Sequence, residues 1–408
     1  MIAQKAEISY RRLSQAEVDT ICAKHERLWR CQPGGARAVF AYTDISGLDF
    51  RGRQLADADF TGAVAVETNF TGAKLDNANL FCIDLQSARM AETSLRRVDL
   101  RGASLRGADL TGADMFEADL REGAIASHHR RDGLRIIEHD VSRAAQAQGV
   151  TLRGANLQRS KLTGVVACKA DFSDAVMKDA KLIRANLKQA TLCGADLAGC
   201  DLSGCDMSGA DLRDAVLVGV KSDYCDMSNA DMAGCLTDKP QGKDVTGLPH
   251  ERMLRAHALW CETGGAEGEP SRFDDADLRA LKSIKRLNLT ALSAKKAVFY
   301  GLDMEGVQLQ GAHLEGADLR GCNLQRADLR GAQLTNAKLS NADLREAQLG
   351  PLLISGDRML KTDLTGAQFK GSDLSRSDLS YAITTGAIFE RAKMTDARTI
   401  GTDPPLRA

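Results

Sequence analysis

The side chains of this sequence that could bind a metal are gathered most densely between residues 126 and 151. His128, His129, Glu138, His139 and Asp140 stand close together there. Imidazole and carboxylate groups are common zinc ligands, but zinc sites use recurring ligand spacings. The spacing of these five residues matches none of the known ligand motifs. We therefore expect them to be surface side chains, and we predict neither a metal site nor any other cofactor.

Cysteines are the next candidates for chemistry, and the chain has 11 of them. The number is odd, the residues are scattered and the sequence has no CxxC pair, which argues against a disulfide framework and a zinc ribbon. Cys200, Cys205, Cys225 and Cys322 each stand two positions before a Leu or Met, where alanine usually stands. A free cysteine packs as a small apolar residue, so we expect packing roles for these thiols.

Motifs for phosphate binding or covalent catalysis are missing from the sequence. The glycine pairs at Gly34-Gly35 and Gly264-Gly265 do not belong to a GxxxxGK(S/T) or GxGxxG motif, and the sequence contains no GxSxG or HExxH. Carboxylates are abundant, but they recur at one position of a repeating unit, which indicates a structural role. The sequence therefore predicts a protein that is not an enzyme.

The unit that positions all these side chains is five residues long. In SLRGADLTGADM, the large apolar residues are Leu105, Leu110 and Met115, and a small residue stands two positions before each. Large residues recur with this period over residues 45–125, 152–232 and 299–394. A helix would spread a five-residue period around its whole surface, and a continuous strand would change faces at every unit. Short extended pieces separated by bends fit the period.

Four bends of about 90° close a square, so one coil should take about 20 residues and stack on the next at about 4.8 Å. Phe50 should then lie under Phe70, and Phe369 under Phe389. Leu110 should be buried in the core with Met90 one coil below. The second bend residue is often Gly, Asn or Asp, which tolerate a positive φ.

The residue just before each large residue is often Asp or Asn. Examples are Asp109, Asn156 and Asp318. We expect these side chains to face outward and to accept hydrogen bonds from nearby backbone amides.

Two stretches carry a resemblance to a known family: RGADLTGADMFEADL (106–120) and EGADLRGCNLQRADLRGAQLTNAKL (315–339). Their unit, A-(D/N)-L-x-x, resembles that of the pentapeptide-repeat family. The resemblance implies an all-β solenoid, a right-handed quadrilateral parallel β-helix of about 20-residue coils. We expect short helical caps and one helical insertion in addition. The resemblance also implies a candidate function. Quinolone-resistance members of the family are acidic dimeric rods thought to imitate duplex DNA toward DNA gyrase.

Several segments interrupt the repeat or flank it. Ser14 and Glu17 form a capping box that predicts a helix over 14–31, and HERLWRC (25–31) is echoed by HALWC (257–261), which indicates a duplicated module. Leu134, Ile137 and Val141 would share one face of a helix. The expected order is a helical cap (1–44), a solenoid tract (45–125), a helical insertion (126–151), a second tract (152–235), a linker with a second capping helix (236–272), a second solenoid (273–396) and a loose tail (397–408).

One stretch inside the last tract, GPLLISGDRMLK (350–361), is ambiguous. It keeps the five-residue period at Ile354 and Met359, but Leu352 and Asp357 stand where small residues are required. We expect a swollen coil here.

Charge and hydropathy limit the partners. The chain has 54 Lys plus Arg and 55 Asp plus Glu, and each tract is nearly balanced, so the sequence favours neither nucleic-acid binding nor a DNA mimic. With no signal-like apolar region after the first charges and no run of 18 apolar residues, we expect a cytoplasmic protein that does not contact a membrane.

The function that the sequence favours on these grounds is a non-catalytic protein-interaction scaffold with an unidentified protein partner. The alternative is a DNA-mimic regulator or protector of a DNA topoisomerase, which a gyrase supercoiling assay would reveal. Outward apolar residues aligned along one face are the candidate binding site. They form two groups, Val176 with Val216 and Val218, and Leu360 with Tyr381.

Overall fold

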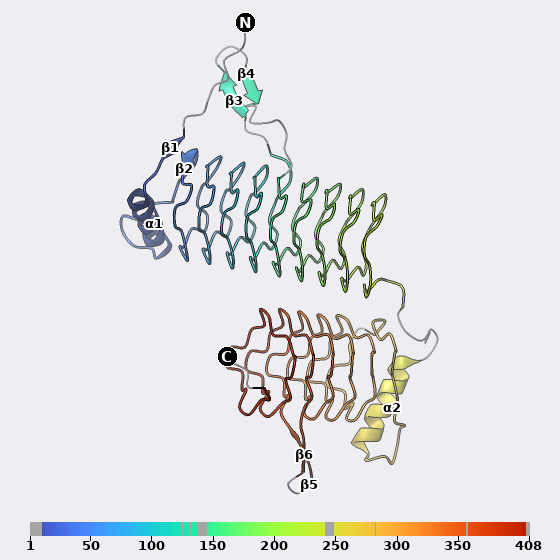
Figure 1. The fold of residues 1–408 in the computed structure, drawn as a ribbon. Helices are drawn as coiled ribbons and strands as arrows, with labels where there is room; N and C mark the ends of the chain where they lie inside the picture. Colours follow the sequence, from blue (N-terminus) through green and yellow to red (C-terminus); the bar gives the residue numbers. More distant parts are fainter. Residues whose placement is uncertain are drawn as a thin grey trace. The chain divides into compact units, whose positions relative to one another are not determined.

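The computed structural model describes residues 10–123, 126–129, 133–136, 145–240, 249–281, 283–355 and 358–404. The chain divides into two compact units, Met1–Asp238 (unit 1) and Lys239–Ala408 (unit 2). Each unit is a stack of coils that runs in one direction, with one helix at its N-terminal end (Figure 1). No helix in the described part of the chain is long and apolar enough to cross a membrane.

Each regular coil is made of four of the five-residue units. Parallel bridges join the residue before each large apolar residue to its equivalent one coil further along, such as Asp84 with Ser104. The N–H of Phe50 donates to the carbonyl of Asn69 at 2.7 Å, and the N–H of Asn69 donates to that of Leu48 at 2.9 Å. Backbone groups of neighbouring coils therefore satisfy one another, as stacked parallel strands require. The predicted solenoid of square coils is confirmed.

The large and small residues of each five-residue unit fill the interior of the coils. Leu110 and Met90 are fully buried. The rings of Phe50 and Phe70 stack with centroids 4.8 Å apart, and those of Phe369 and Phe389 stack at 4.9 Å. The expected ladders of residues one coil apart are therefore present in both units.

Most corners of the coils contain one residue with positive φ. Glycine occupies many of these positions, for example Gly112 at +66°. Charged residues also adopt this conformation, among them Glu67 at +57° and Lys169 at +58°. The corner geometry is thus imposed on residues that disfavour it locally, because the hydrogen bonds between coils fix the backbone on both sides.

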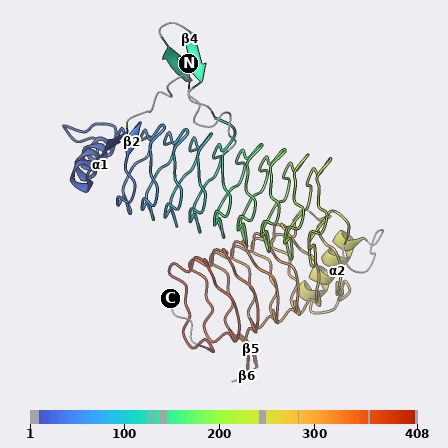
Figure 2. The same ribbon diagram turned by 45° about the horizontal axis from the view of Figure 1, so that its top comes forward.

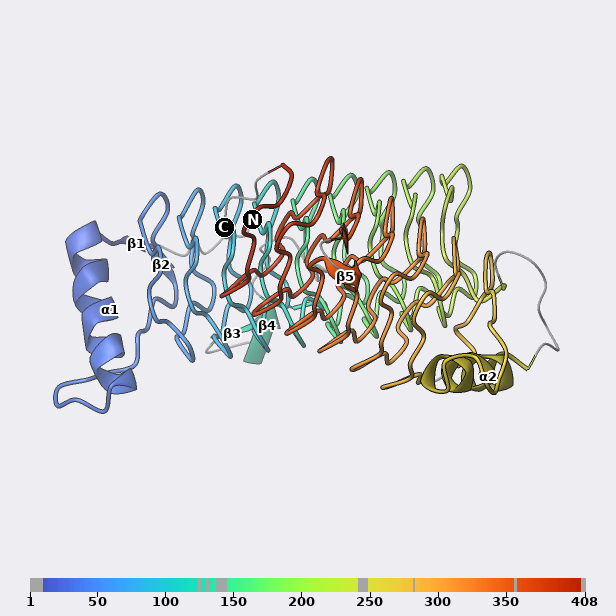
Figure 3. The same cartoon turned by 90° about the horizontal axis from the view of Figure 1, so that it is seen from below.

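Unit 1 begins with a helix that covers its first coil. Helix α1 (Gln15–Trp29) starts at the capping box of Ser14 and Glu17, which confirms that prediction. Strand β1 (Arg11–Arg12) pairs in parallel with β2 (Thr43–Asp44). The coils start earlier than the expected residue 45, since Val39 already pairs with Asp59. Figure 3 shows α1 lying across this end of the stack.

The insertion in unit 1 leaves the stack undisturbed. Ser104 pairs with Gln146, whereas a coil of regular length would bring residue 124 to this place, so a segment is inserted at one corner. The repeat therefore resumes at Gln146, before the expected residue 152. Strands β3 (Ala126–His129) and β4 (Gly133–Ile136) pair antiparallel. The predicted helix is wrong for these residues, because they form a hairpin, and its continuation over 137–144 lies outside the described residues.

Unit 2 repeats the plan of unit 1. Helix α2 (His250–Glu262) precedes coils that begin at Arg272, which pairs with Ser293. The first of these coils is longer by a single residue, because Asp277 pairs with Val298 instead of position 297, whereas Ser283 pairs with Asp303 at the regular distance. The expected loose tail is wrong for 397–403, since Arg398 and Asp403 still pair with the preceding coil.

A second hairpin replaces the swollen coil predicted at 350–361. Gln333 pairs with Asp363, whereas a regular coil would bring position 353 there, so this coil also carries an insertion. Strands β5 (Leu352–Ser355) and β6 (Arg358–Leu360) pair antiparallel with a bulge between Leu353 and Ser355, and they project from the coils (Figures 1 and 2). Ile354 and Met359 are therefore not core residues, although they keep the five-residue period.

Candidate interaction surfaces

The recurring carboxylates are bonded within their own coil. The Oδ1 of Asp109 accepts hydrogen bonds from the N–H of Thr111 at 3.0 Å and from its hydroxyl at 2.6 Å. Asn156 and Asp318 accept the N–H of the residue two positions further on in the same way. The structural role predicted for this position is confirmed.

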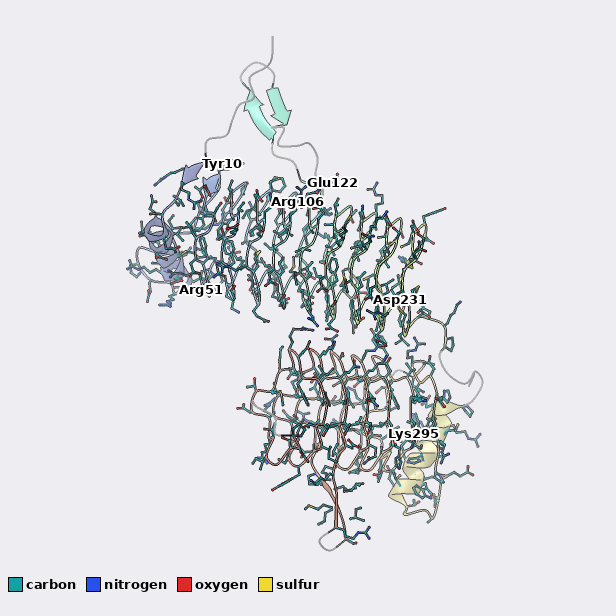
Figure 4. All side chains as sticks on the ribbon, viewed as in Figure 1. Tyr10, Arg51, Arg106, Glu122, Asp231 and Lys295 are labelled. Atoms are coloured by element: carbon teal, nitrogen blue, oxygen red, sulfur yellow. The ribbon has the colours of Figure 1, made fainter. Side chains whose placement is uncertain are left out.

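Many arginines are paired with these carboxylates. The Nε and Nη2 of Arg213 donate to the two oxygens of Asp211 at 2.9 and 2.7 Å, and this hydrogen bonding lowers the pKa of Asp211. The same two-pronged pairing recurs in seven further Asp-x-Arg units, at Arg51, Arg101, Arg121, Arg279, Arg320, Arg330 and Arg345. Figure 4 labels Arg51 near the α1 end of unit 1. These outward charges cancel in pairs, so the coils do not present an extended field of either sign.

The cysteines at small positions have the predicted packing role. Cys200 and Cys205 are buried, and their thiols donate to the carbonyls of Met177 and Leu182 at 2.9 and 2.8 Å. Cys322 bonds the carbonyl of Phe299 at 3.1 Å. Burial raises the pKa of Cys205 to about 12. A thiol with so high a pKa is a poor nucleophile at neutral pH.

The histidine-rich insertion adds nothing that can be placed as a site. The structure describes the backbone of His128 and His129 but not their side chains. Glu138, His139 and Asp140 lie outside the described residues altogether. Among the residues that are described, no group of three or more His, Cys, Asp or Glu side chains could hold a metal ion.

A groove of about 560 Å³ lies where α1 meets the first coils, lined by Gln15, Asp19, Asp49, Arg51 and Arg53. Its polar groups are engaged with one another. Gln15 donates to the carbonyl of Asp49 and accepts its N–H, and Arg53 pairs with Asp19 at 2.6 Å. The hydrogen bonds in the groove therefore join the capping helix to the coils. Because the polar groups that line it already bond one another, the groove does not indicate a ligand site.

The valine group of unit 1 is aligned as expected but is not an exposed patch. Val176, Asp196 and Val216 are joined by successive parallel bridges along one face. Val176 and Val218 are half-buried, whereas Val216 is only 1% exposed. Leu236 pairs with Val216 in the next coil. The expectation that Val216 is exposed is therefore wrong, although Val216 occupies the same position of its five-residue unit as Val176.

The apolar residues of unit 2 gather around the β5–β6 hairpin. Leu353, Ile354 and Met359 are 64%, 56% and 62% exposed. At the same corner of later coils, Tyr381 is 49% and Ile400 is 69% exposed, and the N–H of Tyr381 donates to the carbonyl of Ile400. We call these five residues the hairpin surface. It is a cluster of exposed apolar side chains on an otherwise polar, charge-paired coil.

The base of the hairpin is fitted against the coils. A methyl group at Gly331 would lie 2.9 Å from the Cβ of Leu352 and 3.1 Å from the Cδ2 of Leu360. Because Gly331 has no side chain, these two leucines can pack closely on the corner. Leu360 is thus half-buried in an anchoring role, while Tyr381 is an exposed part of the surface. Leu360 and Tyr381, which were predicted from the sequence, lie at the corner that carries the hairpin, whereas Leu353, Ile354, Met359 and Ile400 were not predicted as exposed surface residues.

The repeat unit can be compared with known families at this point. Eight copies of the pentapeptide-repeat model match residues 54–80, 83–121, 151–189, 170–209, 180–219, 312–349, 360–396 and 372–403, which together span just over half of the chain. This chain belongs to the pentapeptide-repeat family. No curated protein matches it.

The chain is also similar to solved structures of pentapeptide-repeat proteins, at low TM-scores. Rfr23 from the cyanobacterium Cyanothece 51142 is 23% identical over 35% of this chain and 88% of its own, with a TM-score of 0.23. HetL from Nostoc sp. strain PCC 7120, involved in heterocyst differentiation regulation, is 20% identical over 82% and 90%, with a TM-score of 0.15. QnrB1, a plasmid-mediated fluoroquinolone resistance protein, is 18% identical over 57% and 95%, with a TM-score of 0.23. Similarity at this level transfers no function to this pentapeptide-repeat protein.

Proposed function

We propose that this pentapeptide-repeat protein is a non-catalytic protein-interaction scaffold and that the hairpin surface binds its protein partner. The observation that carries the proposal is the exposure of Leu353, Ile354 and Met359 on a hairpin inserted between coils that stay in register on both sides of it. Single exposed apolar residues are ordinary. A cluster of them on one projecting element is the kind of surface that marks a partner site.

The rigidity of the coils supports this proposal. Leu352 and Leu360 hold the hairpin against Gly331, and the coils on both sides continue in register. A partner would therefore meet a surface that is already ordered, which lowers the entropy lost on binding. Truncation of the few residues that carry most of the binding energy of an interface costs about 2 kcal/mol or more each.

The charge pattern does not favour the alternative of a DNA mimic. A mimic needs a net negative field, and here Asp211 and the carboxylates of seven further Asp-x-Arg units are each bonded to an arginine. The gyrase supercoiling assay with the purified protein remains the direct test of that alternative.

A reducing compartment such as the cytoplasm suits the eleven cysteines, all of which are described and none of which forms a disulfide.

The test uses three variants of the full chain. Leu353→Asp with Met359→Asp places charges on the hairpin surface. Removal of residues 351–360 deletes the hairpin and joins Gly350 to Lys361, so that a lysine takes the positive-φ corner position, as Lys169 does elsewhere. Pro351 has to be removed as well, because proline cannot adopt a positive φ. Tyr224→Ser, at a residue that is 98% exposed on unit 1, is the matched control.

Affinity capture from the native host with wild-type protein would identify the partner, and calorimetry with the purified partner would then compare the variants. We expect both hairpin variants to bind at least about tenfold more weakly, with unchanged thermal midpoints, and Tyr224→Ser to bind like the wild type. Equal affinity of all four proteins would exclude the hairpin surface.

A further inference from the structure

The two capping helices carry the same buried histidine arrangement. His25 of α1 is 1% exposed, and His257 of α2 is 2% exposed. In the first cap the N–H of Ala38 donates to Nδ1 of His25 at 3.1 Å, and Nε2 lies 2.9 Å from the carbonyl of Ala56. In the second cap the N–H of Ser271 donates to Nδ1 of His257 at 3.0 Å, and Nε2 lies 3.1 Å from the carbonyl of Thr290.

These contacts replace the partners that a preceding coil would supply. Further along the stack, the carbonyl of Asp76 accepts the N–H of Asp57 from the coil before it, and the N–H of Ala58 bonds the carbonyl of Leu55. Ala56 and Ala38 occupy the same two positions one coil earlier, where the described residues form neither a preceding coil for Ala56 nor the equivalent turn for Ala38. The imidazole of His25 supplies both the missing donor and the missing acceptor. His257 does the same for Thr290 and Ser271.

The hydrogen bonds require a neutral ring with its proton on Nε2. Nδ1 accepts an amide N–H, so it carries no proton, and Nε2 must then donate to the carbonyl. A second proton on Nδ1 would face the amide N–H of Ala38 or Ser271. Protonation therefore breaks one bond in each cap and leaves two donors opposed in a buried place.

The surroundings of the two rings favour the neutral form overall. Burial lowers the pKa of His25, although the Ala56 carbonyl, Asp57 and Glu26 act in the opposite direction and Arg37 acts in the same direction as burial. Burial also lowers the pKa of His257, against the carbonyl of Thr290. The indole N–H of Trp29 shares the Ala56 carbonyl, and the thiol of Cys261 shares that of Thr290.

We propose that the two caps are acid-sensitive closures, in which protonation of His25 and His257 releases α1 and α2 from the first coil of each unit. The sign follows from the direction of the shift. A histidine that is harder to protonate when folded stabilises the cap above its ordinary value of 6.5. This stabilisation is lost as the pH falls from 6.5 through the folded value. Release would uncover apolar residues of the first coils and their unpaired strand edges.

The test is hydrogen exchange on the full chain at pH 7.5 and pH 5, corrected for the intrinsic exchange rate. We expect exchange in α1 and α2 to rise at pH 5, by about tenfold for each unit of pKa depression, while the central coils of each unit stay protected. His25→Gln and His257→Gln, made separately, provide an amide that donates and accepts at both pH values. Each should remove the pH response of its own cap only. His313→Gln, at a half-exposed histidine outside the caps, should change neither response.

An NMR titration of the two rings covers the case in which a Gln variant folds poorly. It should show the Nε2–H form and a pKa below 6.5 for both. The proposal is overturned if wild-type caps exchange equally at both pH values, or if a folded Gln variant loosens with acid as the wild type does. A pKa at or above 6.5 for both rings would also overturn it.

Discussion

Replacing Phe50 with leucine tests whether the ring ladder at the start of unit 1 stabilises the coils beyond simple burial. The Phe50 ring is stacked on Phe70 at 4.8 Å and meets Phe40 and Phe60 edge-on at 5.3 and 6.1 Å. Each aromatic pair contributes about 0.5–1.5 kcal/mol beyond its buried area. Contacts that share one ring are not additive, so we expect Phe50→Leu to lower the free energy of unfolding by about 1.5–3 kcal/mol.

The control is Phe172→Leu. Phe172 is equally buried, yet it has no aromatic ring contact within the described residues. A swap of one apolar residue for another of similar size should cost less than about 1.5 kcal/mol there. Urea unfolding followed by circular dichroism measures both variants. In a Trp260→Phe background, the fluorescence of Trp29 follows unfolding at the capped end of unit 1, because its indole N–H donates to the carbonyl of Ala56 in the first coil. An equal loss at both sites would refute a specific contribution from the ring ladder.

Four further outcomes are expected. Leu110→Ala should lower the free energy of unfolding by about 2–5 kcal/mol because Leu110 is fully buried, and an unchanged urea midpoint would contradict this. Lys169→Gly should raise it by about 1 kcal/mol by relieving the +58° φ, and a loss of stability in the same melt would speak against strain at the corners. Arg213→Gln should raise the pKa of Asp211, which the arginine now lowers. The stabilisation that the pairing gives the fold is present above the ordinary carboxyl pKa and is lost as the pH falls through the folded value. If an NMR titration found the same pKa for Asp211 in the variant and in the wild type, the pairing would not be maintained in solution. Deleting residues 123–144 should restore the regular coil length between Ser104 and Gln146 and leave the circular-dichroism spectrum unchanged, whereas loss of β signal would show that the insertion is needed for folding.

The solenoid could be predicted from the sequence because its repeat is enforced by geometry at every coil. A residue such as Leu110 must point inward whatever its neighbours are, since backbone bonds to the coils on either side set its orientation. The capping box at Ser14 is a local signal of the same kind. Both depend on residues close in sequence or separated by a fixed distance.

The hairpin surface could not be predicted in this way. Ile354 and Met359 fall on the five-residue period by coincidence, and only the missing small residues at positions 352 and 357 signalled that the coil was broken. The two strands of the hairpin, LLIS and RML, are so short that their local pattern differs from the five-residue period over only a few residues. Exposure has no periodic signature either, so Val216 was expected outside and lies buried.

The insertions in the coils bear on how the chain can change during evolution. The long segment before Gln146 enters at a corner and is not a whole number of five-residue units, yet the bridges resume in register after it. The single residue added after Asp277 also leaves the following bridges in register. Homologues should therefore tolerate gaps of any length at corners. New binding loops can thus be gained or lost at a corner without compensating substitutions in the core.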